Sequence, residues 1–96
     1  MQRATKIVVT LGPACSEPAI LSRMLAAGVD VVRLNFSHGQ ASDHIERASL
    51  VRSAAKALGH EVAIMADLQG PKIRVGKFSA GRVTLATGAT FVLDAE

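Results

Sequence analysis

Hydrophobic and polar positions over the first two thirds of the chain follow two alternating patterns. Short apolar, β-branched runs predict three buried strands, at residues 6–10, 29–36 and 62–66. Between these runs, apolar residues recur every three or four positions, which is typical of helices that pack on a sheet. The order strand, helix, strand, helix, strand predicts an α/β fold, a βαβαβ unit with a parallel sheet and right-handed connections.

Both predicted helices have recognisable ends. The first begins after an N-cap at Ser16 and ends at Gly28, and the second covers residues 42–58 and ends at Gly59. Each helix has one apolar side that should face the sheet. These positions are Ile20, Leu21, Met24 and Leu25 in the first helix, and Ile45, Ala48, Val51, Ala55 and Leu58 in the second.

The pattern changes near residue 74. No helical period follows, and residues 82–85 and 90–93 predict two short antiparallel strands around a turn. We therefore expect two parts: residues 1–73 form the α/β unit, and residues 74–96 begin a separate β-rich domain. Three parallel strands leave both sheet edges unpaired, so we expect the chain to be the N-terminal portion of a larger protein.

Composition narrows the possible partners. The chain is 49% hydrophobic, only 3% aromatic, and carries a net charge of +3 from scattered Lys and Arg residues. This favours small anionic ligands over nucleic acid, which needs a basic stripe or stacking aromatics. The single cysteine, Cys15, allows no internal disulfide and fits a reducing compartment. No stretch approaches the ~20 apolar residues of a membrane helix, so we expect a soluble, intracellular protein.

Polar side chains lie on one face of the second predicted strand and of the turn after it. Alternation places Arg33, Asn35 and Ser37 together, whereas Leu34 and Phe36 face the other side. These polar groups lie at the carboxyl end of a parallel strand, where α/β proteins bind ligands. The guanidinium suits phosphate, while the amide and hydroxyl suit a cation or a phosphate. Alternatively, Arg33 pairs with a structural carboxylate and the other two groups cap the turn.

A carboxylate reaches the same rim from the third strand. Ala63, Met65 and Asp67 share a face, so Asp67 should lie near the polar groups of the second strand. A carboxylate beside an amide and a hydroxyl has the composition of a cation site. The alternative is a structural salt bridge from Asp67 to Arg33 or Arg74.

Three motifs in order make the sequence resemble the pyruvate kinase family. They are TKIVVTLGPA from Thr5, AGVDVVRLNFSHG from Ala27, and DLQGPKIRVG from Asp67. The resemblance implies a (β/α)8 barrel interrupted after its third strand by a small β-rich lid, so that residues 1–73 supply the first three βα units. It also implies phosphoryl transfer from phosphoenolpyruvate to ADP, giving pyruvate and ATP in glycolysis. A cytoplasmic homotetramer that uses Mg²⁺ is implied as well.

The resemblance assigns roles residue by residue. Arg33 would hold the phosphate of phosphoenolpyruvate. The nucleotide phosphates would be bordered by Asn35, Phe36, Ser37, His38 and Arg74. The family's monovalent-cation site would be matched by Asn35, Ser37, Asp67 and the carbonyl of Leu68. The catalytic lysine and the divalent-metal ligands of the family lie on later strands, so residues 1–96 alone should be inactive.

Lys72 distinguishes two variants of the third motif. The potassium-requiring form resembles DTKGPEIRTG and has a glutamate where this chain has Lys72. A lysine ammonium is a compact positive charge with three donors, similar in charge to a potassium ion. We hypothesise that Lys72 serves as an internal cation and that potassium is not required. The alternative is that Lys72 extends outward and pairs with a lid carboxylate.

Two other functions fit part of the sequence. The chain could be a truncated, non-catalytic remnant that binds an anionic metabolite or a partner subunit through its sheet edge. It could also belong to another barrel enzyme that acts on phosphoenolpyruvate or pyruvate, such as an aldolase, although such an enzyme would have no reason to carry the GPKIRVG segment.

Overall fold

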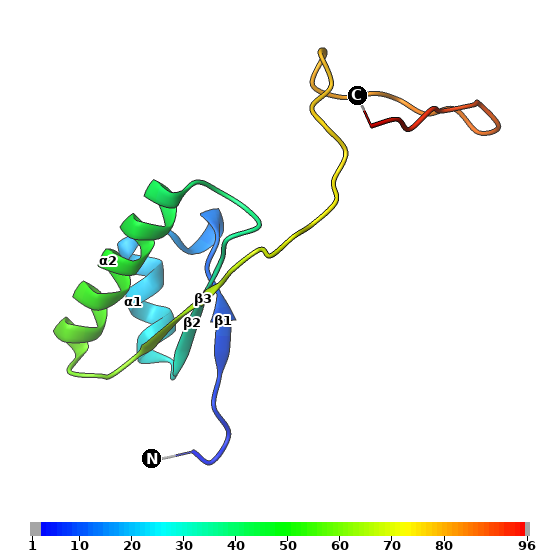
Figure 1. Ribbon diagram of the computed structural model, residues 1–96. Coiled ribbons are helices and arrows are strands. Elements are labelled where there is room, and N and C mark those ends of the chain that lie inside the picture. Colours follow the sequence, from blue (N-terminus) through cyan, green and yellow to red (C-terminus); the bar gives the residue numbers. More distant parts are fainter. Residues whose placement is uncertain (1–2, 96) are drawn as a thin grey trace.

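The computed structural model describes residues 3–95 and contains a three-stranded parallel sheet covered by two helices (Figure 1). The strand order is β1-β2-β3, and the sheet register aligns Thr10 with Arg33 and Asn35 with Asp67. The elements are β1 (Val8–Thr10), the 3₁₀ turn η1 (Pro13–Cys15), α1 (Pro18–Ala26), β2 (Val31–Asn35), α2 (Ala41–Leu58) and β3 (Ala63–Asp67). The predicted βαβαβ order and parallel sheet are confirmed.

The core lies between the helices and one face of the sheet. Val32 and Leu34 of β2 are buried there against Leu21 and Leu25 of α1 and Val51 of α2. Arg33 and Asn35 alternate with them and lie on the opposite face, because successive side chains of a strand point to opposite sides. The helices therefore cover one apolar face, and the uncovered face carries the apolar Val8 and Met65 as well as the polar residues at its carboxyl end.

The predicted apolar sides of the helices were partly wrong. Ile20, Ile45 and Leu58 are exposed, with 70% of Ile45 accessible, whereas His44 is only 4% exposed. The inward-facing positions of α2 pass through His44, Ala48, Val51 and Ala55 at spacings of four, three and four residues. That series has the same helical spacing as the predicted one, but it begins at the buried His44 and not at the neighbouring Ile45. Of these residues, His44, Val51 and Ala55 are buried, and Ala48 packs against the core.

The helix ends follow the prediction at three points of four. Gly59 has φ 63° at the end of α2, and Gly28 has φ 116° just after α1, so both adopt conformations that glycine allows at low cost. The second helix also begins where expected. Ser16, however, is not the N-cap of α1: that position is Glu17, with Pro18 in the first turn. The Ser16 hydroxyl instead donates to the carbonyl of Gly12 at 2.9 Å and closes the preceding turn.

Residues 68–95 leave the sheet as an extended arm (Figure 1). No strand is present at residues 82–85 or 90–93 in the described chain, so the two predicted strands were wrong in this structure. Two turns do form, with backbone hydrogen bonds from Gly81 to Phe78 and from Ala89 to Ala86. An isolated pair of short segments is marginal without further strands or a covering layer, which explains why the turns form without a ladder.

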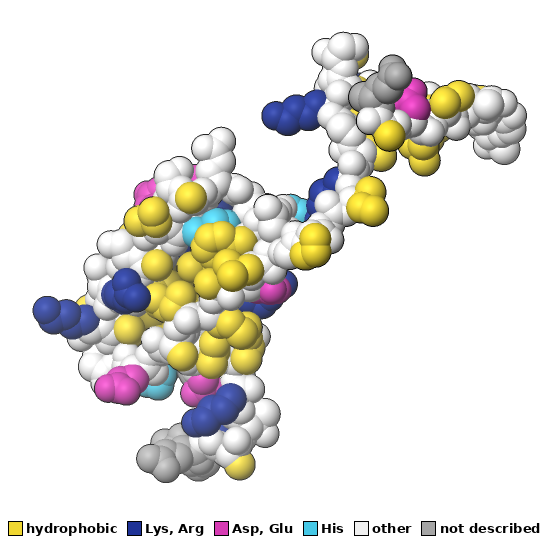
Figure 2. Space-filling view, in the orientation of Figure 1, with side chains coloured by type: hydrophobic (Ala, Val, Ile, Leu, Met, Phe, Trp, Pro, Cys, Tyr) yellow, Lys and Arg dark blue, Asp and Glu magenta, His cyan; other side chains and the backbone are white. Residues whose placement is uncertain are grey.

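The arm carries much of the exposed apolar surface. Figure 2 shows hydrophobic side chains gathered over the α/β part and others spaced along the arm. Ile73 is fully exposed, and Phe78 contacts Phe91 edge to face with a centroid distance of 6.4 Å. None of the helices in residues 3–95 is long and apolar enough to cross a membrane.

Candidate functional site

The candidate site lies at the carboxyl ends of β1, β2 and β3, on the sheet face that the helices leave uncovered. Strand pairing sets Thr10 beside Arg33 and Asn35 beside Asp67. The parallel arrangement brings the three strand ends to one edge, which is where α/β proteins place ligands. The predicted convergence of Arg33, Asn35 and Asp67 at this edge is therefore present in the structure. We call these residues, with Ser37 and Lys72, the strand-end cluster.

Arg33 is held by groups from both neighbouring strands. Its Nε donates to Asp67 Oδ2 at 3.0 Å, its Nη2 also contacts Asp67 Oδ2, and its Nη1 donates to Thr10 Oγ1 at 3.0 Å. Both nitrogens that meet Asp67 use one oxygen, so the second carboxylate oxygen is not needed for this pair. The alternative interpretation, in which Asp67 pairs with Arg33, describes this ligand-free geometry. The two side chains are 29% and 45% exposed, and ion pairs with this much exposure contribute little to stability.

The turn after β2 positions the remaining polar groups. Asn35 Oδ1 accepts the amide hydrogen of Ser37 at 3.1 Å, and the backbone carbonyl of Asn35 accepts that of His38 at 3.2 Å. The amide of Phe36 donates to the carbonyl of Asp67 at 3.0 Å, which joins the ends of β2 and β3. The Phe36 ring itself packs on the core side, so only its backbone lies at the rim.

Lys72 returns to this turn from the start of the arm. Its Nζ donates to Ser37 Oγ at 2.9 Å, although the two residues are 35 positions apart in the sequence. A lysine that extended freely into solvent would make no such contact. The geometry places a full positive charge beside the hydroxyl that the sequence assigned to the cation site.

Within the described chain, two predicted site residues are not held in the strand-end cluster by any contact. Arg74 is on the arm, where it lines a hollow of about 410 Å³ together with Phe78 and Phe91. The structure therefore does not bring Arg74 to the strand-end cluster. Leu68 directly follows β3 and is 74% exposed, which leaves its carbonyl near the end of the strand but assigns it no partner.

A hollow of about 480 Å³ adjoins the cluster at the ends of β1 and β2. Asn35 and His38, two of the five residues expected to border the nucleotide phosphates, line it. Sequence reasoning missed the other lining residues, which are Thr10, Leu11, Gly12, Pro13, Gly39, Asp43 and Arg47. The signal for the first four was the TLGP turn directly after β1, which occupies the same sheet edge as the second and third motifs. The two residues of α2 lie in its first two turns, and the signal for them was that this helix starts directly after the turn that follows β2.

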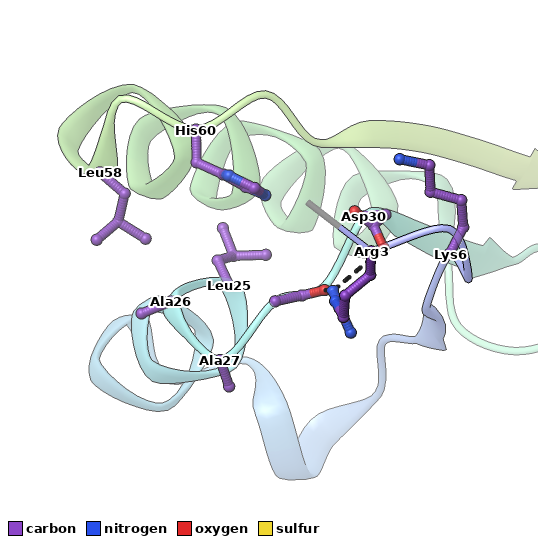
Figure 3. Close-up of a pocket in the computed structure, with 9 residues that line it drawn as sticks. Arg3, Lys6, Leu25, Ala26, Ala27, Asp30, Leu58 and His60 are labelled. Carbon is purple, nitrogen blue, oxygen red and sulfur yellow. Dashed lines mark hydrogen bonds and ion pairs between the residues drawn. The ribbon is translucent and has the colours of Figure 1, made fainter. Parts of the chain in front are cut away.

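A third hollow, of about 720 Å³, lies at the opposite, amino-terminal end of the sheet (Figure 3). Arg3, Lys6, Asp30 and His60 line its polar side. Asp30 accepts the amide hydrogen of Ile7 at 2.8 Å and pairs with Arg3 at 3.5 Å. The Ile7 amide and the nearby positive charges of Lys6 and Arg3 hold the pKa of Asp30 below its ordinary value of 3.8, although partial burial opposes the shift. These contacts join the strand starts and have a structural role.

The strand-end cluster does not fit a divalent metal by itself. In residues 3–95 no three His, Cys, Asp or Glu side chains gather as metal ligands. Asp67 is the carboxylate of the cluster, and Arg33 and Lys72 bring positive charge to it. Magnesium prefers several oxygen ligands with net negative charge, so this part of the chain suits an anion such as a phosphate better.

The fold and the cluster together define a class: a parallel α/β protein with a phosphate-compatible, cationic cluster at the carboxyl ends of its strands. Comparison with known proteins then gives the family. The family model "Pyruvate kinase, barrel domain" matches residues 2–96, and the chain belongs to the pyruvate kinase family. The resemblance seen in the three motifs is confirmed, and the sheet with its two helices is the beginning of that family's (β/α)8 barrel.

Individual relatives agree closely over this region. Pyruvate kinase of Haemophilus influenzae is 56% identical over 94 residues, which are 98% of this chain and 20% of the relative. Pyruvate kinase II of Salmonella typhimurium is 56% identical over 97% of this chain and 19% of the relative. A crystal structure of Cryptosporidium parvum pyruvate kinase matches with a TM-score of 0.77 and 43% identity over 84% of this chain and 17% of that chain. The chain thus spans about a fifth of the length of these curated relatives.

Proposed function

We propose that the complete protein carrying this chain transfers the phosphoryl group of phosphoenolpyruvate to ADP, giving pyruvate and ATP. Family membership supports the reaction, and one observation supports the part played by this chain. Arg33 lies at the carboxyl end of β2, between Thr10 and Asp67, with its guanidinium on the uncovered face of the sheet. Phosphoryl transfer depends mainly on positioning and on neutralising charge, which is what such a group supplies.

Arg33 is proposed to hold the phosphate of phosphoenolpyruvate. Its planar fork matches two phosphate oxygens, and phosphate carries more charge than the single carboxylate oxygen of Asp67. Substrate can therefore replace Asp67 as the partner of Nε and Nη2. Thr10, which meets the third nitrogen, can keep its bond during that exchange.

The hollow of about 480 Å³ is proposed to receive the nucleotide. Asn35 and His38 belong to it, and the backbone of Phe36 and the hydroxyl of Ser37 lie on the turn between them. Arg74 would join only if the arm moved toward the strand ends. We infer that residues 74–96, which include most of the arm, are the start of the family's lid, and lid closure over phosphates would make such a movement useful.

Lys72 is proposed to replace a monovalent cation. Its bond to Ser37 Oγ supports this role over outward extension. When phosphate displaces Asp67 from Arg33, we expect the Lys72 ammonium to become the partner of the freed carboxylate, so that Asp67 does not stay unpaired. Potassium is then not required.

Groups for the chemical step itself are proposed to come from outside the described residues. The cluster does not fit Mg²⁺, so the ligands of that metal would also lie outside the described residues. We expect purified residues 1–96 to show no phosphoryl transfer, and we expect the complete protein to be a cytoplasmic homotetramer, as the family suggests.

The proposal is tested by Arg33→Lys in the complete protein. Lysine keeps the charge but loses the fork, so kcat/KM for phosphoenolpyruvate should fall by about 10- to 100-fold. The matched control is Arg52→Lys on the exposed side of α2, which should change it less than twofold, roughly the effect of a neutral surface substitution. Equal rates for the Arg33 variant and the unmodified protein would remove Arg33 from the substrate site.

A further inference from the structure

His44 is a buried histidine that the proposed reaction does not use. It lies in the first turn of α2 and is 4% exposed, among otherwise apolar core residues. Its ring stacks on Phe36 with a centroid distance of 4.3 Å and an angle of 24° between the rings. Phe36 is the residue directly after β2, so the stack joins the helix to the start of the turn that carries the candidate site.

One ring nitrogen of His44 holds this turn directly. Nε2 lies 2.7 Å from the backbone carbonyl of His38. A carbonyl can only accept, so Nε2 carries the hydrogen and donates it. In the neutral ring Nδ1 then has a lone pair, and in the described chain this buried atom has no hydrogen-bond partner.

The unpartnered Nδ1 costs folding free energy, and an apolar side chain at this position would avoid that cost. Buried polar atoms are nearly always paired, because leaving water without a new partner is unfavourable. A phenylalanine at this position would fill a similar volume and stack on Phe36 without that cost. The feature that phenylalanine cannot supply is the donor to His38, and this points to the bond as the reason for the histidine.

The turn held by His44 is also held by its neighbour. Asp43 Oδ2 accepts the amide hydrogen of Gln40 at 2.8 Å. Gly39 has φ 73°, and a Cβ placed there would lie 3.2 Å from Asp43 Oδ2 and 3.6 Å from His44 Nε2. The turn is therefore packed closely against the first turn of α2, and the glycine is required both by its backbone conformation and by this approach.

We propose that His44 is a positioning residue for nucleotide binding: its bond to the His38 carbonyl fixes the turn between β2 and α2, whose residues border the nucleotide hollow and whose Ser37 meets Lys72. The proposal rests on the proposed function, because it assigns a substrate to that hollow. His38 and Gly39 both line the hollow, and Asp43 lines it from the helix. Loss of the hydrogen bond between His44 and the His38 carbonyl would let these lining residues move.

The effect should fall on ADP more than on phosphoenolpyruvate. Arg33 is oriented from β1 and β3, through Thr10 and Asp67, and makes no use of the His44 bond. The KM for phosphoenolpyruvate is therefore expected to stay nearly constant when the turn is loosened. This difference separates a positioning role from a general loss of folding, which would harm both substrates.

The test compares His44→Phe and His44→Gln in the complete protein. His44→Phe removes the donor and the unpartnered nitrogen together, so the KM for ADP should rise about three- to tenfold, the value of one hydrogen bond, while the melting temperature does not fall. His44→Gln carries a donor of similar reach and should recover much of the affinity for ADP. Ile45→Ala, on the exposed side of the same helix turn, is the control and should change neither quantity.

Hydrogen exchange supplies a readout independent of activity. The His38 amide, bonded to the Asn35 carbonyl, should exchange faster in His44→Phe, whereas the amides of β2 should keep their rates. The proposed role of His44 would be overturned by unchanged hydrogen exchange or by an unchanged KM for ADP. It would also be overturned by an equal rise in both KM values together with a lower melting temperature. An unmodified protein without phosphoryl transfer would instead overturn the proposed function, and exchange would still decide whether His44 holds the turn.

Discussion

At the scale of single residues, the site depends on which charges pair in the absence of ligand. Arg33 and Asp67 are partners in the structure, and Lys72 meets Ser37 nearby. Two cations and one carboxylate leave the cluster with a positive surplus, which favours a phosphate ligand. The ion pair and the proposed substrate site are therefore two states of the same residues.

Lys72→Glu tests the internal cation. The substitution replaces the positive charge by a negative one beside Ser37, so turnover without potassium should fall by about tenfold or more, as expected when a fixed charge near a transferring phosphoryl group is lost. Added potassium should restore much of it. Lys77→Glu, on the exposed arm, should have little effect in either salt. Loss of activity that potassium does not relieve would argue against the cation role.

Sequence reasoning was strong for strand residues and weak for turns and helices at the site. Alternation along β2 and β3 correctly placed Arg33, Asn35 and Asp67 on one face. The placement of Arg74 depends on the path of the arm, which no local pattern determines. His44 was overlooked because polar residues are assigned to the outside of a helix by default, and only packing reveals the exception.

At the scale of elements, the two helices secure the face opposite the site. Leu21 and Leu25 of α1 are each 1% exposed, and Val51 of α2 meets the same core. The strand ends are thus positioned by packing on the sheet face opposite the candidate site.

Leu21→Ala should measure the contribution of α1. It removes a fully buried side chain and leaves a cavity, so the free energy of unfolding should fall by about 2–5 kcal/mol. Ile45→Ala on α2 should change it by less than about 0.5 kcal/mol, because the side chain is exposed. Denaturant titration of both variants gives the comparison. Equal losses would mean that Ile45 is buried in the complete protein.

The strands expected at residues 82–85 and 90–93 illustrate a limit of pattern reading. Their residues are suitable for strands, and turns form between them at Ala86–Ala89 and before the first of them at Phe78–Gly81. A strand, however, is defined by its partner, and in the described chain the arm has no sheet to join. Helices α1 and α2 were easier to predict because their hydrogen bonds are local.

At the scale of the whole molecule, the two ends of the sheet have different roles. The carboxyl end gathers the candidate site, while at the amino end Asp30 joins the strand starts. Its side chain accepts from Ile7 and pairs with Arg3, and its backbone bonds to both Ile7 and Ala63. The contacts of Asp30 hold the strands together at the amino end of the sheet. The ion pair of Arg33 lies at the other end, so a change of its partner would leave these contacts intact.

Asp30 predicts a pH dependence of stability. Because its pKa in the folded state is lowered, the ionised carboxylate stabilises the fold above 3.8, and this contribution is lost as the pH falls through 3.8 and below. Asp30→Asn should therefore lower stability at neutral pH and flatten the acid side of the stability curve. Asp94→Asn, on the exposed arm, serves as the control. A variant whose acid unfolding matched that of the unmodified protein would contradict the role of Asp30.

We propose that this chain supplies the substrate and cation part of a pyruvate kinase site, with Lys72 as its own cation. The most direct measurement is phosphoryl transfer from phosphoenolpyruvate to ADP by the complete protein with magnesium, comparing potassium with tetramethylammonium as the monovalent cation. We predict equal turnover in both salts. Turnover only with potassium would contradict the role of Lys72, and no turnover in either salt would contradict the proposed function.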